Sequence, residues 1–363
     1  MRIVETAEPP DRWDENLVRT GKEGSFLQTA FWGGLIALLD RAKPIYLQAW
    51  EGTECLASLL VLHKIPFDRA RGQRIRRLRH VLAGKSNGWL DFSGGPVFHV
   101  PESAENILPL FLSWLNDYMK KKGVGFAETG GFATTSRFAH DPRMAEIFGS
   151  FGYRKDSWGT YLVDLTGDEE EVWRRLEPAS RKAVKKAQRE NMTIERIISF
   201  DEFLSRFYEP YMSTLDQKIK KLARDVLEKS WNYPHSSSYY RYYAAMGPDR
   251  RVLGVLGMYV FAGVATEVMS GLMTEAFQKK LPAQDLLHWE MFLDAKRFGC
   301  ETFDLAGVNP NSETPKERGI RRFKEKWGGQ YLEYDRYRKG GQGCVFKALA
   351  PLASLRRKLK RRD

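Results

Sequence analysis

The residue best suited to chemistry in this chain of 363 residues is a lysine in the segment G-I-R-R-F-K-E-K-W-G-G. The preceding segment, F-D-L-A-G-V-N-P-N from Phe303, is a short apolar run that breaks at Gly307, as a buried strand does where it enters a loop. Lys324, which follows the aromatic Phe323, could place its positive charge beside a reactive carbonyl group. The alternative interpretation is a core strand followed by a solvated basic helix.

A second candidate is a row of cations in the segment from Glu169 to Glu190. Its second half, S-R-K-A-V-K-K-A-Q-R-E, places Arg181 and Lys185 one helical turn apart with no acid between them. Such a ridge is either solvated surface or a phosphate-binding face. Pro178 is expected to divide the segment into two helices, with Ser180 as the N-cap of the second.

The overall charge points in the same direction. The formal net charge is +12 and the pI is about 9.4, which favours a polyanionic partner such as nucleic acid, a phosphate-bearing substrate or an anionic membrane surface. Residues 69–79 are the most basic stretch. They form either a solvated loop or hairpin edge, or an arm whose guanidinium groups contact phosphate.

Several function classes are disfavoured by the sequence. Cys55, Cys300 and Cys344 lie far apart without a nearby histidine, so neither a metal site nor a disulfide framework is predicted. No cofactor is predicted. No apolar leader is visible near the N-terminus, and the longest apolar run, Leu56–Leu62, is too short to span a bilayer. The expected location is therefore cytoplasmic.

The elements that must position these residues repeat along the chain. Helical and strand-like segments follow one another in a similar order before and after about residue 155, which favours two similar α/β halves. Helices are expected from about Thr29 and over 107–121, 144–151, 200–231 (broken near Pro210), 239–246 and 283–298. Strands are expected over 45–49, 55–62, 89–97, 126–129, 159–165, 252–261, 265–271 and from Phe303.

With these residues in view, the chain resembles the FemABX family, the aminoacyl-tRNA-dependent transferases that build peptidoglycan cross-bridges. The resemblance rests on F-L-Q-T-A-F-W near the start, G-G-P-V from Gly94, R-K-A-V-K-K-A from Arg181, and the pairing of F-D-L-A-G-V with G-I-R-R-F-K-E-K-W-G-G. It implies an α/β (α+β) fold of two tandem GNAT-like domains. Residues 1–155, completed by 318–363, would form the first domain and residues 156–317 the second.

The resemblance also implies roles for individual residues. Lys324 would stabilise the oxyanion formed when the donor ester is attacked, and Phe323 would shape the wall beside it. Arg181 and Lys185 would hold phosphates of the acceptor. The remaining substrate-binding residues implied by the resemblance are Gln28, Trp32, Gly94, Gly95, Pro96, Asp304 and Gly307. Asp304 is the obvious candidate base, but its apolar strand favours a structural role, with the substrate itself helping to remove the proton.

The chain departs from the family pattern at three positions. Ile36 stands where many members have a basic residue, Lys185 replaces a second arginine, and Gly94 stands where arginine is common. Lysine keeps the charge but loses the bidentate fork of arginine, so substrate choice is expected to differ from that of the best-known members. No long heptad-patterned insertion is present, so the chain resembles the members without a coiled-coil arm.

The function implied is transfer of an amino acid from aminoacyl-tRNA to an amine of a stem peptide on a lipid-linked or UDP-linked muropeptide. Peripheral contact with the inner face of the membrane is expected from a lipid-linked acceptor. The alternative is a GNAT-type N-acyltransferase that uses acyl-CoA. Its pyrophosphate loop would fall on Q-K-K-L-P-A from Gln278 to Ala283, where Leu281 replaces a glycine and Pro282 lacks an amide hydrogen. A third interpretation is a non-enzymatic module that binds tRNA or membrane.

Overall fold

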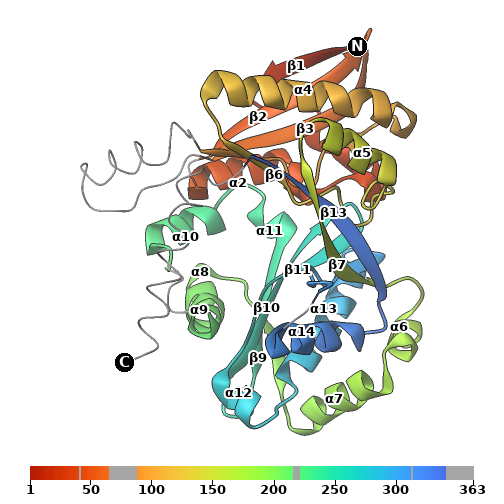
Figure 1. Cartoon of the computed structure of the whole chain (residues 1–363). Coiled ribbons are helices and arrows are strands. Elements are labelled where there is room, and N and C mark those ends of the chain that lie inside the picture. Colours follow the sequence, from red (N-terminus) through yellow and green to blue (C-terminus); the bar gives the residue numbers. More distant parts are fainter. Residues whose placement is uncertain (41, 65–87, 216–220, 312–313, 341–363) are drawn as a thin grey trace, which may run out of the picture. The chain divides into compact units, whose positions relative to one another are not determined.

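The computed structural model describes the chain except residues 41, 65–87, 216–220, 312–313 and 341–363. The arginine-rich segment 69–79 and the basic tail from Leu355 therefore lie outside the described residues. The chain divides into two compact units (Figure 1). The first contains residues 1–157 and the segment from Asp335, and the second contains Trp158–Tyr334.

The first unit is a mixed sheet with the strand order β1-β2-β3-β4-β6-β13, with β5 paired to β3. Its strands are β1 (Arg2–Thr6), β2 (Lys43–Glu51), β3 (Glu54–Lys64), β4 (Trp89–Asp91), β5 (Val97–Phe98), β6 (Phe126–Thr129) and the end of β13 (Gln330–Gly340). Its α-helices in the described residues are α1 (Trp13–Arg19), α2 (Ala30–Asp40), α4 (Ala104–Lys122) and α5 (Pro142–Ser150).

The core of the first unit forms where one face of α4 meets the sheet. The apolar positions of α4 recur at helical spacing, and Ile107, Phe111 and Leu115 are completely buried. They pack with strand residues such as Leu59 and Leu90. Full burial of each such side chain contributes about 1.5–3 kcal/mol. The predicted helix over 107–121 is confirmed, and it extends by three residues toward its N-terminus.

The second unit has the strand order β7-β12-β11-β10-β9-β8, in which β12 is parallel to β11 and antiparallel to β7. Its strands are β7 (Arg154–Asp164), β8 (Thr193–Arg196), β9 (Tyr240–Met246), β10 (Val252–Phe261), β11 (Val264–Leu272) and β12 (Thr302–Asp304). Its helices in the described residues are α6 (Glu169–Arg175), α7 (Pro178–Arg189), α8 (Phe200–Glu202), a π-helix (Phe203–Tyr208), α9 (Glu209–Thr214), α10 (Arg224–Trp231), α11 (Ser236–Tyr239), α12 (Thr274–Gln278), α13 (Ala283–Arg297) and α14 (Pro315–Glu325).

Helix α13 is the central helix of the second unit. Most of its residues are buried, including the polar side chains Gln284, Asp285 and His288. A helix that is buried on all sides is expected to be apolar all round, so three buried polar groups within five residues need partners. The amide nitrogen of Gln284 donates to the carbonyls of Val255 on β10 (3.3 Å) and Gly271 on β11 (2.7 Å). The partners of Asp285 and His288 are described below.

Several predictions about local structure are wrong. Residues 239–246 form mainly the strand β9, which pairs with β8 and β10, because its tyrosines favour a pleated surface with neighbours on both sides. Ser180 does not cap α7: its hydroxyl donates to the carbonyl of Lys326 at 2.8 Å, and Glu177 occupies the N-cap position.

The predicted return of the chain to the first unit at residue 318 is also too early. Residues 318–334 belong to the second unit, and the chain returns at Asp335. The physical reason is the fully buried Trp327, which packs in the core of the second unit. None of the described helices is both long enough and apolar enough to span a bilayer.

Candidate active site at the end of strand β12

The ammonium group of Lys324 lies at the carbonyl end of β12. The side chain is 8% exposed, and its Nζ donates to the backbone carbonyls of Leu305, Ala306 (3.3 Å) and Gly307 (3.4 Å). Within the described part of the chain, no carboxylate lies at ion-pair distance from this Nζ. The structure thus brings together the two segments that the sequence paired, F-D-L-A-G-V and F-K-E-K-W, around a cation whose direct partners are neutral.

The loop after β12 is held in shape by Asp304. This buried carboxylate accepts hydrogen bonds through Oδ1 from the hydroxyl of Thr160 (2.5 Å) and from the backbone amide of Ala306 (2.7 Å). Ala306 has a φ of 61°, an uncommon conformation for a residue with a side chain. The bond from Asp304 fixes this conformation, in which the carbonyl groups that follow β12 reach Lys324.

Gly307 is needed in this loop because Trp158 lies against it. A Cβ atom at Gly307 would be 2.3 Å from the indole Nε1 of Trp158, far inside contact distance. On the far side of the turn, Val308 exchanges backbone hydrogen bonds with Gly159 of β7, at 2.6 and 2.9 Å. The loop is therefore fixed at both ends, and its position does not depend on Lys324 alone.

Phe323 forms a wall together with Trp327 and the imidazole of His288. The His288 ring stacks on Trp327, with centroids 5.2 Å apart and planes at 15°, and meets Phe323 edge-on at 5.0 Å. The ammonium of Lys326 lies 4.2 Å from the Phe323 ring centroid and also pairs with Asp285 of α13. Helix α14 and the two residues after it are thereby attached to α13 through aromatic and charged contacts; both helices are labelled in Figure 1.

A buried pair of titratable groups lies beneath this wall, and the sequence analysis missed it. The Nε2 atom of His288 is 3.4 Å from Oε2 of Glu267 on β11, and the two side chains are 1% and 9% exposed. Burial alone would raise the pKa of Glu267, but the hydrogen bond from His288 and the positive charges of His288 and Lys324 together lower it. An acid within an apolar strand and a histidine within an apolar helix were the available signals.

The predicted phosphate-binding residues lie on α7. Lys185 is exposed, with its Nζ 5.9 Å from the ring centroid of Trp173, whereas the guanidinium of Arg181 donates to the carbonyls of Arg174 (2.8 Å) and Leu176 (2.6 Å). An open hollow of about 690 Å³ lies along this face. Its lining residues are Pro178, Arg181, Lys182, Lys185, Gln188 and Arg189.

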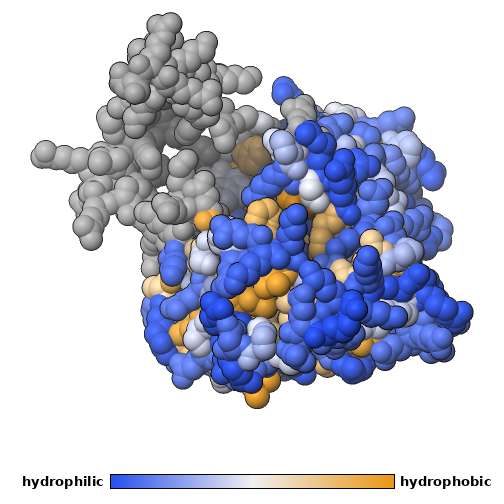
Figure 2. All heavy atoms as spheres, turned by 90° about the horizontal axis from the view of Figure 1, so that it is seen from below, coloured by the Kyte–Doolittle hydropathy of each residue, from blue (hydrophilic) through white to orange (hydrophobic). Residues whose placement is uncertain are grey.

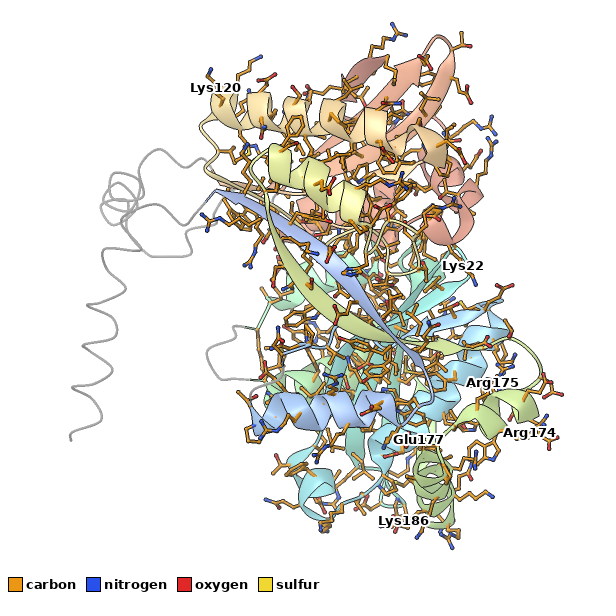
Figure 3. All side chains as sticks on the ribbon, turned by 45° about the vertical axis from the view of Figure 1, so that its right-hand side comes forward. Lys22, Lys120, Arg174, Arg175, Glu177 and Lys186 are labelled. Atoms are coloured by element: carbon orange, nitrogen blue, oxygen red, sulfur yellow. The ribbon has the colours of Figure 1, made fainter. Side chains whose placement is uncertain are left out.

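Helix α7 and its N-cap residue Glu177 are bonded to Lys326, the C-cap residue of α14. The hydroxyl of Ser180 and the backbone amide of Glu177 both donate to the carbonyl of Lys326, two residues after Lys324. Figure 3 shows the exposed side chains of this region, with Arg174 and Arg175 on α6 and Lys186 on α7. The face seen in Figure 2 is mainly hydrophilic, with recessed hydrophobic patches between the polar side chains.

In the first unit, Gln28 is completely buried, and its side chain forms hydrogen bonds with backbone groups. Its Nε2 donates to the carbonyls of Leu60 (3.2 Å) and Ser93 (2.9 Å), and its Oε1 accepts from the amide of Leu60 (2.6 Å). A Cβ atom at Gly95 would lie 2.6 Å from Cδ of Gln28. The structure thus places Gln28 against the Gly94-Gly95-Pro96 turn. The hydrogen bonds and packing of the Gln28 side chain stabilise this turn.

The other predicted residues of this unit differ in exposure. Gly94 has a φ of 78° and is buried, as are Gly95 and Pro96, which are joined by a cis peptide bond. Trp32 on α2 is only partly buried, with its ring 5.6 Å from that of Phe26. Of these residues, Trp32 therefore has the most side-chain surface available to a ligand.

The loop that would bind CoA in the alternative interpretation has few free backbone amides for a pyrophosphate. The amides of Lys279, Lys280 and Leu281 donate to carbonyls of α12, and Pro282 has no amide hydrogen. Among the described residues, no group of three or more histidine, cysteine, aspartate or glutamate side chains is placed to hold a metal ion.

Comparison with known proteins identifies the fold. Residues 243–335 match the FemAB family. A crystal structure of FemX superposes with a TM-score of 0.71 at 11% identity, covering 96% of this chain and 100% of that chain. No curated protein sequence matches the chain.

Two further structures have related folds. A tandem GNAT protein from the clavulanic acid biosynthesis pathway gives a TM-score of 0.56 at 12% identity, covering 94% of this chain and 98% of its own. The structure of L-PGS from Bacillus licheniformis gives 0.53 at 14% identity, covering 92% of each chain. The fold is thus the mixed α/β architecture of tandem GNAT proteins, and within it residues 243–335 are similar to the FemAB family.

Proposed function

We propose that this protein transfers an amino acid from aminoacyl-tRNA to an amine of a peptidoglycan-precursor stem peptide. The family match and the folds of its structural neighbours support an acyltransferase that acts in cell-envelope synthesis. The aminoacyl ester of the donor and the muropeptide acceptor are the more specific part of the proposal.

The observation that carries the proposal is the buried ammonium group of Lys324. It lies against three backbone carbonyls and, among the described residues, has no carboxylate at ion-pair distance. A positive charge whose partners are neutral remains able to stabilise a negative charge that develops nearby. Two of its three hydrogen bonds, to Ala306 and Gly307, are long, so the oxygen of a bound ester could replace one of them at little cost.

Attack of the acceptor amine on the donor ester then needs few further catalytic groups. The acceptor amine attacks the ester carbonyl carbon, and the carbonyl oxygen becomes an oxyanion beside the Lys324 ammonium. Collapse of this intermediate breaks the bond to the ribose oxygen, which leaves with a proton, while the attacking nitrogen loses one. Because the donor is an activated ester, positioning and charge stabilisation supply most of the rate enhancement in this proposal. Asp304 is assigned to the shape of the loop, since its Oδ1 holds the amide of Ala306.

Helix α7 supplies the phosphate-binding part of the proposal. Lys185 is exposed beside the open hollow, and Arg181 contributes charge there although its guanidinium is partly engaged by backbone carbonyls. These cations would hold the phosphates of a lipid-linked or UDP-linked muropeptide. A lipid-linked acceptor would bring the protein into peripheral contact with the membrane. In the first unit, the partly buried Trp32 is the proposed contact to substrate.

A second candidate donor is acyl-CoA, because the tandem GNAT neighbour shares the fold over nearly the whole chain. The loop before α13 argues against it. Three of its amides already bond to α12, and the next residue is Pro282. A pyrophosphate would find few free donors there.

The experiment is a comparison of donors. The protein is incubated with a lipid-linked or UDP-linked muropeptide and either a mixture of charged tRNAs or a set of acyl-CoA thioesters, and the acceptor is analysed by mass spectrometry. The proposal predicts a mass gain of one aminoacyl residue with charged tRNA only. A gain with acyl-CoA only would replace the proposal with the second candidate.

A further inference from the structure

Arg321 lies one helical turn before Lys324 on α14 and binds the same loop after β12. Its Nη1 donates to the carbonyl of Pro310 at 3.2 Å, and Pro310 closely follows Gly307, the last residue whose carbonyl Lys324 reaches. Side chains three positions apart on a helix share one face, with their Cβ atoms about 5–6 Å apart. The two cations of α14 are therefore neighbours that bind the loop at different points.

The guanidinium group of Arg321 is held in place by two tyrosines. It lies 5.2 Å from the ring centroid of Tyr331, and it forms a hydrogen bond with the hydroxyl of Tyr161, which raises the pKa of Arg321. The rings of Tyr161 and Tyr331 pack together with their centroids 5.3 Å apart. The Tyr331 hydroxyl is in turn fixed against Gly159, where an added Cβ atom would lie 2.5 Å from it. The guanidinium therefore keeps its position without a ligand.

Arg321 also has room and hydrogen-bond donors for an anion. Its side chain is only partly buried, and among the residues that the structure describes no carboxylate lies at ion-pair distance from it; Glu325 contributes only a more distant charge. A guanidinium carries five N–H donors, and the bonds to Pro310 and Tyr161 engage only part of them. Stacking on a ring leaves these donors in the plane of the group, where two of them can bind two oxygens of one anion.

The donor proposed above carries an anion at a matching distance. In an aminoacyl-tRNA the ester is formed by the ribose of the 3′-terminal adenosine, and the 5′-oxygen of the same ribose carries the last phosphodiester. An ester at Lys324 therefore has a phosphate one ribose ring away, on the scale that separates neighbouring side chains of one helix face. We propose that Arg321 binds this last phosphodiester and thereby sets the ester carbonyl beside Lys324. The identity of the anion rests on the proposed function, whereas the presence of an anion site at Arg321 does not.

The site is tested by calorimetry with two dinucleotides that copy the end of the donor: cytidylyl-(3′→5′)-adenosine and its methylphosphonate analogue, whose linkage is neutral. The wild type should bind the charged dinucleotide at least about tenfold more tightly than the neutral one. This ratio should fall below about twofold in R321M, be intermediate in R321K, and stay at the wild-type value in R322M, which removes the exposed neighbouring arginine. A merely structural Arg321 would weaken both dinucleotides equally in R321M and keep their ratio, which would overturn the proposal. Failure of the wild type to prefer the charged dinucleotide would also overturn it.

Transfer kinetics then identify the source of the anion. R321M should raise KM for charged tRNA about tenfold and change KM for the muropeptide less than about twofold. The opposite pattern would assign Arg321 to an acidic group of the acceptor and overturn the proposal. If the wild type transfers no amino acid from charged tRNA, the proposed function fails, while the dinucleotide ratio still decides whether Arg321 binds an anion.

Discussion

Replacing Lys324 with methionine removes the charge on which the proposed mechanism depends and keeps a side chain of similar length. Lys324 is 8% exposed, and its ammonium group makes its hydrogen bonds to the carbonyls that follow β12. Two unit charges about 4 Å apart at an effective dielectric constant of about 20 interact by about 4 kcal/mol. The ester oxygen already carries part of the charge before attack, so the differential effect on the transition state is about 3 kcal/mol, or a reduction in kcat of about 10²-fold.

The same substitution has a smaller effect on stability. It leaves carbonyls of the β12 loop without their ammonium donor. The Thr160 hydroxyl lies 2.9 Å from the carbonyl of Ala306, but it shares its one proton with Asp304. Such unpaired carbonyls cost about 1–3 kcal/mol in the free energy of unfolding. Thermal unfolding should therefore show a folded K324M protein, destabilised by about this amount, on which kinetics can be measured.

The assay is single-turnover transfer of a labelled amino acid from tRNA to the muropeptide, followed as alkali-stable label on the acceptor. K316M is the matched control, because Lys316 lies on the same helix and is exposed. The expected result is a loss of about 10²-fold in the rate for K324M, near wild-type KM for the acceptor, and a wild-type rate for K316M. A K324M rate within threefold of the wild type, or equal losses in both variants, would refute the reasoning.

Three further predictions concern other parts of the chain. K185A should raise KM for the phosphate-bearing acceptor about tenfold at low salt and by less at high salt. The control K186A removes one partner of a surface ion pair and should change KM less than twofold. Steady-state kinetics at two salt concentrations measures both effects. G307A should lower the free energy of unfolding by about 1–3 kcal/mol in urea denaturation, because the added Cβ atom has no space beside Trp158. G319A should raise the free energy of unfolding by about 0.5–1 kcal/mol, because Gly319 lies on α14 with open space around it. Burial and the charge of Arg19 lower the pKa of His99 to about 4. The free energy of unfolding should therefore fall by up to about 3 kcal/mol as pH drops from about 6.5 to about 4. The fall should be smaller in H99N, and an equal fall in both proteins would contradict the assignment.

The central motif could be predicted from the sequence because its signals are local. An apolar run that ends at a glycine-containing turn predicts a buried strand entering a loop, and a basic segment that ends in two glycines predicts a helix that stops there. Both are present, as β12 and α14. Their proximity follows from the resemblance to a family, since no property of either segment alone requires Lys324 to reach the carbonyls of 305–307.

The remaining features depend on tertiary contacts. The tyrosine-rich segment 240–246 is a strand because β8 and β10 pair with its two edges, and a single segment does not reveal its neighbours. Glu267 and His288 are separated by 21 positions and read as isolated polar residues in apolar elements. Their meaning as a pair appears only when α13 packs on β11. Likewise, the hydrogen bonds that occupy Gln28 come from Leu60 and Ser93, far away in sequence.

The most direct test of the central claim is the affinity of the protein for an analogue of the tetrahedral intermediate. A phosphonate joining the 3′-terminal adenosine of the donor to the acceptor peptide places a fixed negative oxygen where the oxyanion would form, and calorimetry measures its binding. The account predicts that K324M binds this analogue about 100-fold more weakly than the wild type while both bind the unmodified muropeptide equally. Equal affinity of the two proteins for the phosphonate would contradict it.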